Sequence, residues 1–253
     1  MIDIHCHLLP GVDDGAEDEQ TAVAMCRLAA EHGTTDLVAT PHANHRYEYS
    51  RERCEELRRR VQELAGPSPR IYLGCDFRLT YDNIEAALAE PGRFTINGGQ
   101  YLLVEFSDQV IAAGTSGAFA RLGEVGITPV ITHPERNPLL RNHHGRLAVW
   151  VERGCLIQVT GQSLLGRFGN SAREAGIKLI GSGLAHIVAS DGHDVEKRPP
   201  VLDDSLAFVV DRWGEELAQQ LFVENPRAVV DGQAIAPPRP RLRRERKWWQ
   251  VWK

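Results

Sequence analysis

The sequence of 253 residues lacks most of the features that mark secreted or membrane-spanning chains. Its five cysteines form no Cys-x-x-Cys pair, so we expect reduced thiols and no disulfide framework. A run of about 18 apolar residues is missing, and so is a charged-then-apolar leader, which excludes a spanning helix and predicts a cytoplasmic location. A Gly-rich first turn is also missing, which argues against an open nucleotide-binding sheet.

Charge is unevenly distributed along the chain. Residues 237–253 hold seven of the 29 Lys and Arg but one of the 34 Asp and Glu, so this tail carries +6 and the remainder −11. An acidic body of this kind is not typical of nucleic-acid-binding domains, and no nucleic-acid partner is expected. The basic residues and Trp248, Trp249 and Trp252 predict weak contact of the tail with an anionic membrane surface, hence a possible membrane-peripheral location. Packing of these Trp side chains on the acidic body or on a neighbouring subunit is the alternative.

The first seven residues contain two histidines at alternate positions. In an extended strand Asp3, His5 and His7 point to one face and the intervening apolar residues to the other. Neutral imidazole nitrogen is a common ligand of zinc, iron and other transition metals. The strand therefore predicts a two-histidine pincer on a metal ion.

Hydrophobic patterning predicts alternating strands and helices. Strands are expected at 1–7, 35–40, 70–76, 101–106, 128–133, 155–160 and 187–190, and helices at 17–32, 50–65, 82–89, 115–125, 143–153, 168–178, 203–213 and 215–223. This order indicates an α/β fold with a parallel sheet covered by helices, and seven such units favour a barrel. We assign residues 1–232 to this single domain and residues 233–253 to a Pro/Arg/Trp-rich basic tail, because three prolines within 237–240 end the pattern.

Ligand-type side chains follow six of the seven predicted strands. They are His7, His42, Asp76, Glu105, His133, and Asp191 with His193. In a parallel barrel all carboxyl ends of strands meet at one rim, where active sites are built from the following loops. Residues far apart in the sequence therefore become neighbours, and the pattern predicts a multinuclear metal site.

One apparent catalytic motif is rejected. Cys54 and Arg60 have the Cys-x5-Arg spacing of thiolate phosphatases. That chemistry needs a phosphate-cradling loop of small residues before a helix amino terminus. Here the two residues are expected in mid-helix, with two glutamates beside the thiol. The spacing is therefore interpreted as incidental.

The separate motifs together resemble the polymerase and histidinol phosphatase (PHP) superfamily. They are Asp3-x-His5-x-His7, Asp13-Asp14-Gly15, Thr40-Pro41-His42, Gly74-x-Asp76, Glu105, His133-Pro134-Glu135-Arg136 and Ser190-Asp191-x-His193. Within that superfamily, the Asp-Asp-Gly, His-Pro-Glu-Arg and Ser-Asp-x-His strings, with Arg198-Pro199-Pro200, resemble the bacterial capsule-operon manganese-dependent protein-tyrosine phosphatases. The resemblance runs from Met1 to about Gly232.

The resemblance implies a distorted seven-stranded (β/α)7 TIM-like barrel of the PHP fold, holding three divalent metal ions. Manganese is the expected metal, with iron or zinc as alternatives. The implied ligand sets are His5, His7, Asp76 and Asp191; Asp76, Glu105 and His133; and Asp14, His42 and His193. Asp76 departs from the pattern, because relatives usually place the longer Glu at this bridging position.

The implied reaction is hydrolysis of phosphotyrosine by a metal-activated hydroxide. Arg136 and Arg198 lie beside ligands on the same rim and are expected to grip the phosphoryl oxygens, and His42 or His193 is the candidate acid. The implied partner is a phosphotyrosine-containing protein, the tyrosine-rich tail of a bacterial tyrosine kinase that regulates capsule or exopolysaccharide synthesis. A small-molecule phosphoesterase resembling histidinol phosphatase and a non-catalytic binding module remain open as alternatives.

Overall fold

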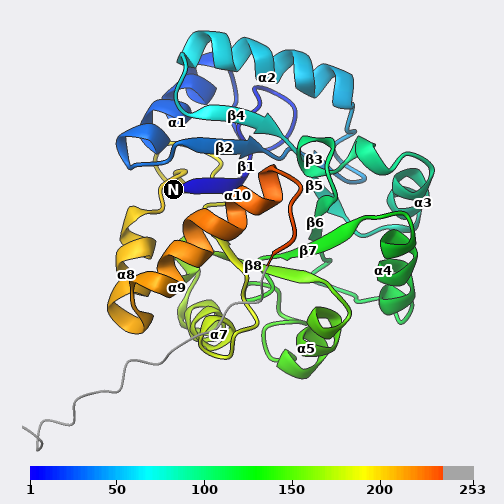
Figure 1. The fold of residues 1–253 in the computed structure, drawn as a ribbon. Helices are drawn as coiled ribbons and strands as arrows, with labels where there is room; N and C mark the ends of the chain where they lie inside the picture. The colour runs from blue at the N-terminus through cyan, green and yellow to red at the C-terminus, as the bar shows by residue number, and fades with distance from the viewer. Residues whose placement is uncertain (236–253) are drawn as a thin grey trace, which may run out of the picture.

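The computed structural model describes residues 1–235, in which parallel strands alternate with helices (Figure 1). The strands are β1 (Ile2–Cys6), β2 (Asp36–Ala39), β3 (His42–Ala43), β4 (Arg70–Leu73), β5 (Asp76–Arg78), β6 (Tyr101–Glu105), β7 (Thr128–Thr132), β8 (Leu156–Thr160) and β9 (Ile187–Ala189). The helices are α1 (Glu19–Glu31), α2 (Arg51–Ala65), α3 (Tyr81–Ala89), α4 (Thr115–Glu124), α5 (His144–Glu152), α6 (Gly161–Leu164), α7 (Asn170–Gly181), α8 (Asp203–Trp213), α9 (Glu215–Gln219) and α10 (Asn225–Val230). Most of the predicted tail, residues 236–253, lies outside the described residues.

The strands form two parallel sheets, in the orders β1-β2-β4 and β3-β5-β6-β7-β8-β9. Two predicted strands are each divided in two, since β3 directly follows β2 and β5 directly follows β4. Pro41, which has no N–H to donate to a ladder, lies at the first break. The mixed α/β architecture with parallel sheets is confirmed, whereas closure into one seven-stranded barrel stays a prediction.

Backbone hydrogen bonds connect the first strand to the segment after the last one. Asp191 N donates to His5 O at 2.8 Å, and His7 N donates to Gly192 O at 2.8 Å. Asp3 adds a side-chain link, because it accepts from Ser190 N at 3.0 Å and from Ser190 Oγ at 2.5 Å. The carboxyl end of β1 is thereby held beside that of β9.

The helices surround the strands, and α10 lies across them in Figure 1. Ser50 caps the amino end of α2, since its side chain accepts from Arg53 N. An apolar cluster joins residues of β1, β6, β7 and β9 to Val229 and Val230 of α10. Gln100 and Tyr101, at the start of β6, bond the backbone just after α10. The last helix therefore closes the amino ends of the strands and leaves the opposite rim for the site.

The chain after α8 departs from the predicted single helix at 215–223. It runs from α9 through a π-helical turn at Gln220–Glu224 into α10.

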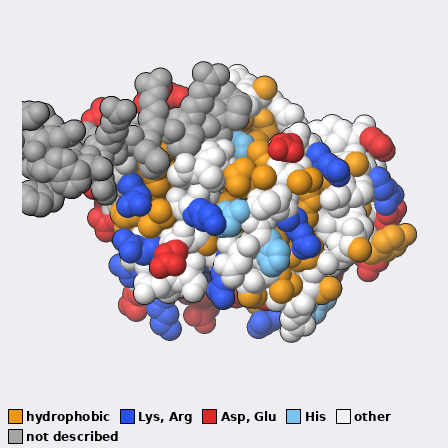
Figure 2. Space-filling view, turned by 90° about the horizontal axis from the view of Figure 1, so that it is seen from below, with side chains coloured by type: hydrophobic (Ala, Val, Ile, Leu, Met, Phe, Trp, Pro, Cys, Tyr) orange, Lys and Arg blue, Asp and Glu red, His pale blue; other side chains and the backbone are white. Residues whose placement is uncertain are grey.

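Within residues 1–235, no helix combines the length and apolar composition that crossing a membrane requires. Seen from the side on which α5 and α7 lie, the surface intersperses basic, acidic and hydrophobic side chains (Figure 2).

Candidate metal centre

The nine residues predicted as metal ligands come together at the carboxyl ends of the strands. Their ligand atoms form four overlapping groups, in each of which all atoms lie within 4.8 Å of one another. The groups are His5, His7 and Asp76; His5, His133 and Asp191; His42, Asp76 and Glu105; and His7, Asp14, His42 and His193. The structure thus brings the predicted ligands together, whereas their role as metal ligands stays a prediction.

The deepest part of the cluster is built on the histidine pair of β1. The Nε2 atoms of His5 and His7 lie 3.3 Å apart. Asp191 Oδ1 lies 3.3 Å from His5 Nε2 and 3.4 Å from His7 Nε2. Asp76 Oδ2 is 3.8 Å from His5 Nε2, and all four side chains are buried. Lone pairs and negative charge that converge in a buried site are costly unless a cation joins them.

Asp76 provides a direct test of whether these residues fit a metal. The residue is fully buried, and neither of its carboxylate oxygens makes a hydrogen bond, although Oδ2 lies 3.1 Å from His42 Nδ1, an ion pair that forms only when that imidazole is protonated. Nearly all buried polar atoms in proteins have a partner, so this carboxylate lacks one that a metal ion would provide. It also belongs to two of the four groups, which is the position that a bridging ligand needs.

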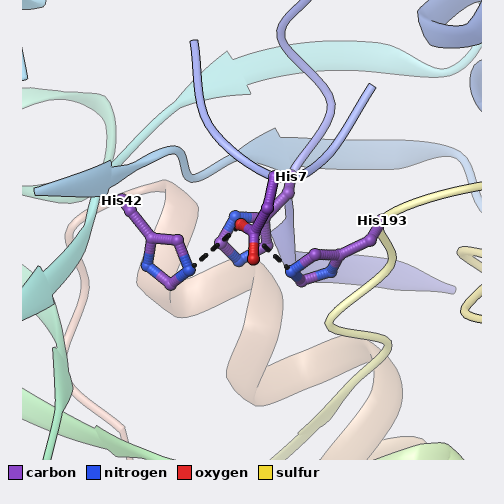
Figure 3. A group of neighbouring side chains, drawn as sticks. His7, His42 and His193 are labelled. Atoms are coloured by element: carbon purple, nitrogen blue, oxygen red, sulfur yellow. Dashed lines mark ion pairs between the residues drawn. The ribbon is translucent and has the colours of Figure 1, made fainter. Parts of the chain in front are cut away.

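The outer group is arranged around His7. His42 and His193 approach it from either side, and ion pairs run from both outer rings to a carboxylate (Figure 3). That carboxylate is Asp14, whose Oδ1 lies 3.4 Å from His42 Nε2 and 3.8 Å from His193 Nε2. The Asp14 side chain is 48% exposed, in contrast to the buried inner groups. Solvent and substrate therefore have access to the centre on this side.

The groups differ in three places from the predicted sharing of ligands. His133 lies with His5 and Asp191 rather than with Asp76 and Glu105. His42 reaches both Asp14 and Asp76, and His7 joins the outer group as well as the inner one. His133 and Asp191 both have positive φ, 33° and 53°. Such backbone conformations are unfavourable for residues other than glycine and concentrate at functional sites.

Two side chains that orient the histidines were not assigned from the sequence. His7 Nδ1 lies 2.8 Å from Asp13 Oδ2, and His5 Nδ1 lies 3.1 Å from Gln158 Oε1. Each contact leaves Nε2 directed at the cluster, as outer partners of metal-binding histidines do. The two adjacent carboxylates therefore differ in role, because Asp13 orients His7 and Asp14 joins the outer group.

Gly15 is required by the close approach of this loop to β1. A Cβ atom at Gly15 would lie 2.0 Å from His7 O and 2.4 Å from His7 Cβ. Asp13 Oδ1 accepts from Gly15 N at 3.0 Å and Asp13 Oδ2 from His42 N at 3.0 Å. The Asp-Asp-Gly motif therefore fixes the orienting carboxylate against both β1 and β3.

Arg136 and Arg198 lie at the edge of the cluster. Both guanidinium groups pair with Asp191 Oδ2, Arg198 Nη2 at 2.5 Å, while Asp191 Oδ1 faces the histidine pair. Phe168 supports both, with its ring centre 4.4 Å from Arg136 Cζ and 5.8 Å from Arg198 Cζ. The two cations are thus held beside the ligands, where an incoming anion would meet them.

The cluster holds its ligands in different protonation states. Burial by itself would lower the pKa of His42 and of His7, but neighbouring carboxylates outweigh it. Asp14 and Asp76 raise the pKa of His42 to about 11. Asp13 raises the pKa of His7 to about 9. Burial, with the charge of His7, lowers the pKa of His193 to about 3. Burial, with the charge of Asp76, raises the pKa of Glu105 to about 7.

Metal binding is therefore expected to release protons. A protonated imidazole cannot ligate, so an ion must displace the protons that His7 and His42 hold up to pH values of about 9 and about 11. Affinity should rise with pH across the neutral range and weaken as pH falls. Titration calorimetry with Mn²⁺ in buffers of different ionisation enthalpy measures the released protons. Asp13→Asn should release fewer, because it removes the charge that raises the pKa of His7; equal heats in all buffers would contradict the expectation.

The remaining candidates in the sequence lie outside the cluster. Cys54 is buried within α2, and burial raises the pKa of its thiol to about 11, which disfavours a thiolate nucleophile. His45, three residues after His42, is exposed and joins none of the four groups. Neither residue offers chemistry to the site.

His, Asp and Glu side chains gathered at the carboxyl ends of parallel strands are the arrangement of metal-dependent hydrolases built on parallel α/β folds. A family model described as "Capsular polysaccharide synthesis, CpsB/CapC" matches residues 1–231. The chain belongs to the CpsB/CapC family.

Named relatives agree with this assignment. The chain is 34% identical over 252 residues to the tyrosine-protein phosphatase YwqE of Bacillus subtilis, covering 97% of this chain and 98% of that protein. It is 29% identical over 244 residues to the tyrosine-protein phosphatase CpsB of Streptococcus pneumoniae, covering 93% and 100%. A crystal structure described as YwqE and CpsB, "unique metal-dependent tyrosine phosphatases", matches with a TM-score of 0.85 at 34% identity, over 96% of this chain and 100% of that one.

Proposed function

We propose that this protein is a metal-dependent protein-tyrosine phosphatase. The observation that carries the proposal is the convergence of buried histidines with the Asp76 and Asp191 carboxylates, beside which Arg136 and Arg198 are held. The relatives named tyrosine-protein phosphatases, which match over nearly their whole length, support the choice of substrate. Phosphate monoester hydrolysis needs both a nucleophile and positive charge around the phosphoryl oxygens, and this cluster suits both requirements.

We propose three divalent ions, manganese in the first instance, held by the nine clustered residues. Ions bound there would lower the pKa of a coordinated water molecule and place positive charge beside the phosphate oxygens. Asp76 is the proposed shared ligand, and Asp13 and Gln158 hold the rings of His7 and His5 in the binding orientation. We further propose that the strands close as the distorted seven-stranded PHP barrel, which the hydrogen bonds between β1 and the segment after β9 support.

The side chains around the cluster have separate tasks in this proposal. Arg136 and Arg198 grip the phosphoryl oxygens, and Phe168 keeps both guanidinium groups in place. Of the two histidines predicted as acid, His42 retains its proton up to a pKa of about 11, whereas the pKa of His193 is about 3. Both histidines also belong to the outer ligand group, so the acid of the reaction is the one of the two that no ion holds.

The proposed substrate is a phosphotyrosine-bearing protein, the tyrosine-rich tail of a bacterial tyrosine kinase that acts in capsule synthesis. The family description supports the link to capsular polysaccharide. We place the enzyme in the cytoplasm, where such a tail would be accessible. The proposed membrane contact concerns Trp248, Trp249 and Trp252, which lie outside the described residues.

Phosphate release from a phosphotyrosine peptide tests the proposal. Activity should vanish with a chelator and return with Mn²⁺, while a thiol alkylator and Cys54→Ser should have little effect. Histidinol phosphate serves as the comparison substrate, and its preferred turnover would favour the small-molecule phosphoesterase instead. Peptide hydrolysis that survives chelation would refute metal dependence.

Asp76→Glu is expected to keep or raise metal occupancy. The longer side chain restores the reach of the usual family residue, and Asp76 already lies between two of the groups. Asp76→Asn should lower occupancy, because it preserves the shape but removes the charge. Elemental analysis after purification in Mn²⁺ compares the three proteins, and a lower metal content in Asp76→Glu than in Asp76→Asn would contradict the bridging role.

A further inference from the structure

An apolar groove of about 620 Å³ lies between α3 and α4. Its lining includes Leu79, Tyr81, Ile84, Phe106, Val110 and Ala118. Tyr81 and Val110 are 73% and 65% exposed, the largest fractions among the exposed large hydrophobic side chains of the described residues. Apolar side chains gathered in a groove of this size offer a surface that another apolar group can cover.

The groove adjoins the candidate metal centre. Phe106 lines the groove and also a polar cavity of about 80 Å³, which Glu105, His133 and Arg136 line as well. The groove walls begin with Leu79 just after β5 and with Phe106 just after β6, the strands that carry Asp76 and Glu105. A phosphoryl group on the cluster would therefore place the residues attached to it beside this groove.

The charges of the groove indicate what it would accept. Its charged lining residues are Arg121 and Glu124, one of each sign, and Arg121 already pairs with Glu85 at 2.7 Å. The arginine pair beside the cluster, Arg136 and Arg198, in contrast suits an anion. The two neighbouring sites thus differ in preference, one for a phosphoryl group and the other for an apolar side chain.

We propose that this groove binds a large apolar side chain close to the phosphotyrosine of the protein substrate. The inference rests on the proposed phosphatase function and adds a determinant of sequence preference. A phosphate held at the cluster fixes the tyrosine, and its neighbour then covers Phe106 and Val110. Burial of one such side chain is worth roughly a 10-fold or larger gain in kcat/KM.

Gly117 allows the groove to be filled without removing a side chain. It lies on α4 in the lining, and a Cβ atom there would meet no atom within 4 Å. Gly117→Trp places an indole in the groove, and Gly117→Ala is the matched control that changes the backbone in the same way but fills little space. Both variants are compared with the wild type on phosphotyrosine peptides in which Leu or Ser stands in turn at each flanking position.

The wild type should favour the best Leu peptide over its Ser counterpart by roughly 10-fold or more. Gly117→Trp should remove this preference and Gly117→Ala should keep it. If Gly117→Trp does not fold, Val110→Asp should remove the preference in its place, with Leu64→Asp on α2 as the control for an added charge. Equal kcat/KM for all Leu and Ser peptides, or a preference unchanged in Gly117→Trp, would refute the proposed role of the groove. Either result would leave the proposed phosphatase function unaffected. Failure of the wild type to hydrolyse any phosphotyrosine peptide would overturn both.

Discussion

Arg136→Ala is expected to lower kcat for phosphotyrosine peptide by roughly 10²–10³-fold while the protein keeps its metal. Arg136 is held beside the cluster by Asp191 and by the ring of Phe168, so its charge is already positioned when the phosphoryl group arrives. It contacts Asp191 through Oδ2, whereas Oδ1 faces the histidines. Removal of the arginine therefore weakens the stabilisation of negative charge on the phosphoryl group but leaves the metal ligands in place.

Steady-state kinetics and elemental analysis of the same preparations test this separation. Arg136→Lys should recover part of the rate, because lysine restores the charge but not the bidentate geometry. Arg141→Ala, on the same loop and outside the four groups, is the matched control and should behave as the wild type. Normal turnover in Arg136→Ala would remove this residue from the mechanism.

His5→Ala is expected to lose both bound metal and turnover, with activity falling to that of the chelated enzyme. His5 belongs to two of the four ligand groups and is fully buried. Its loss removes a neutral ligand from the inner cluster and weakens the binding of the ion that would compensate the negative charges of Asp76 and Asp191. A reduction of at least roughly 10²-fold in kcat/KM should accompany the loss of metal.

His45→Ala provides the matched control, because this exposed histidine lies in the neighbouring loop and outside the cluster. Its metal content and activity should equal those of the wild type. Circular dichroism should confirm that His5→Ala is folded before its metal is measured. A folded His5→Ala protein with full metal content would show that the ligand assignment at β1 is wrong.

The composition of the site was predictable because parallel strands impose a simple geometry. Side chains at the carboxyl ends of such strands must lie near one another, so local patterns sufficed to bring Glu105 and His133 together with His5. Which ligands would lie close enough to share one metal ion was less predictable. It depends on differences of about an ångström between side chains, and His133 took different neighbours from those expected.

Partners from distant strands carried weaker signals. Gln158 contacts His5 across 153 residues of sequence. Its local signal is an amide side chain in the middle of β8, a strand that is buried along its whole length. A buried polar residue in such a strand needs a partner, and that reasoning would have identified Gln158 as part of the site. The division of two predicted strands was also missed, since hydrophobic patterning does not show where a ladder is interrupted.

The contact between the first and last strands has a consequence for the order of events during synthesis. Asp3 and Ser190, which bond one another, are 187 residues apart. The ribosome therefore releases His5 and His7 long before Asp191 and His193. A nascent chain that ends before β9 has seven of the nine ligands, but it lacks Asp191 and His193 and also Ser190, which bonds Asp3. The ions can be captured as a set only when translation of the domain is nearly finished, so metal loading reports that the whole domain has been made.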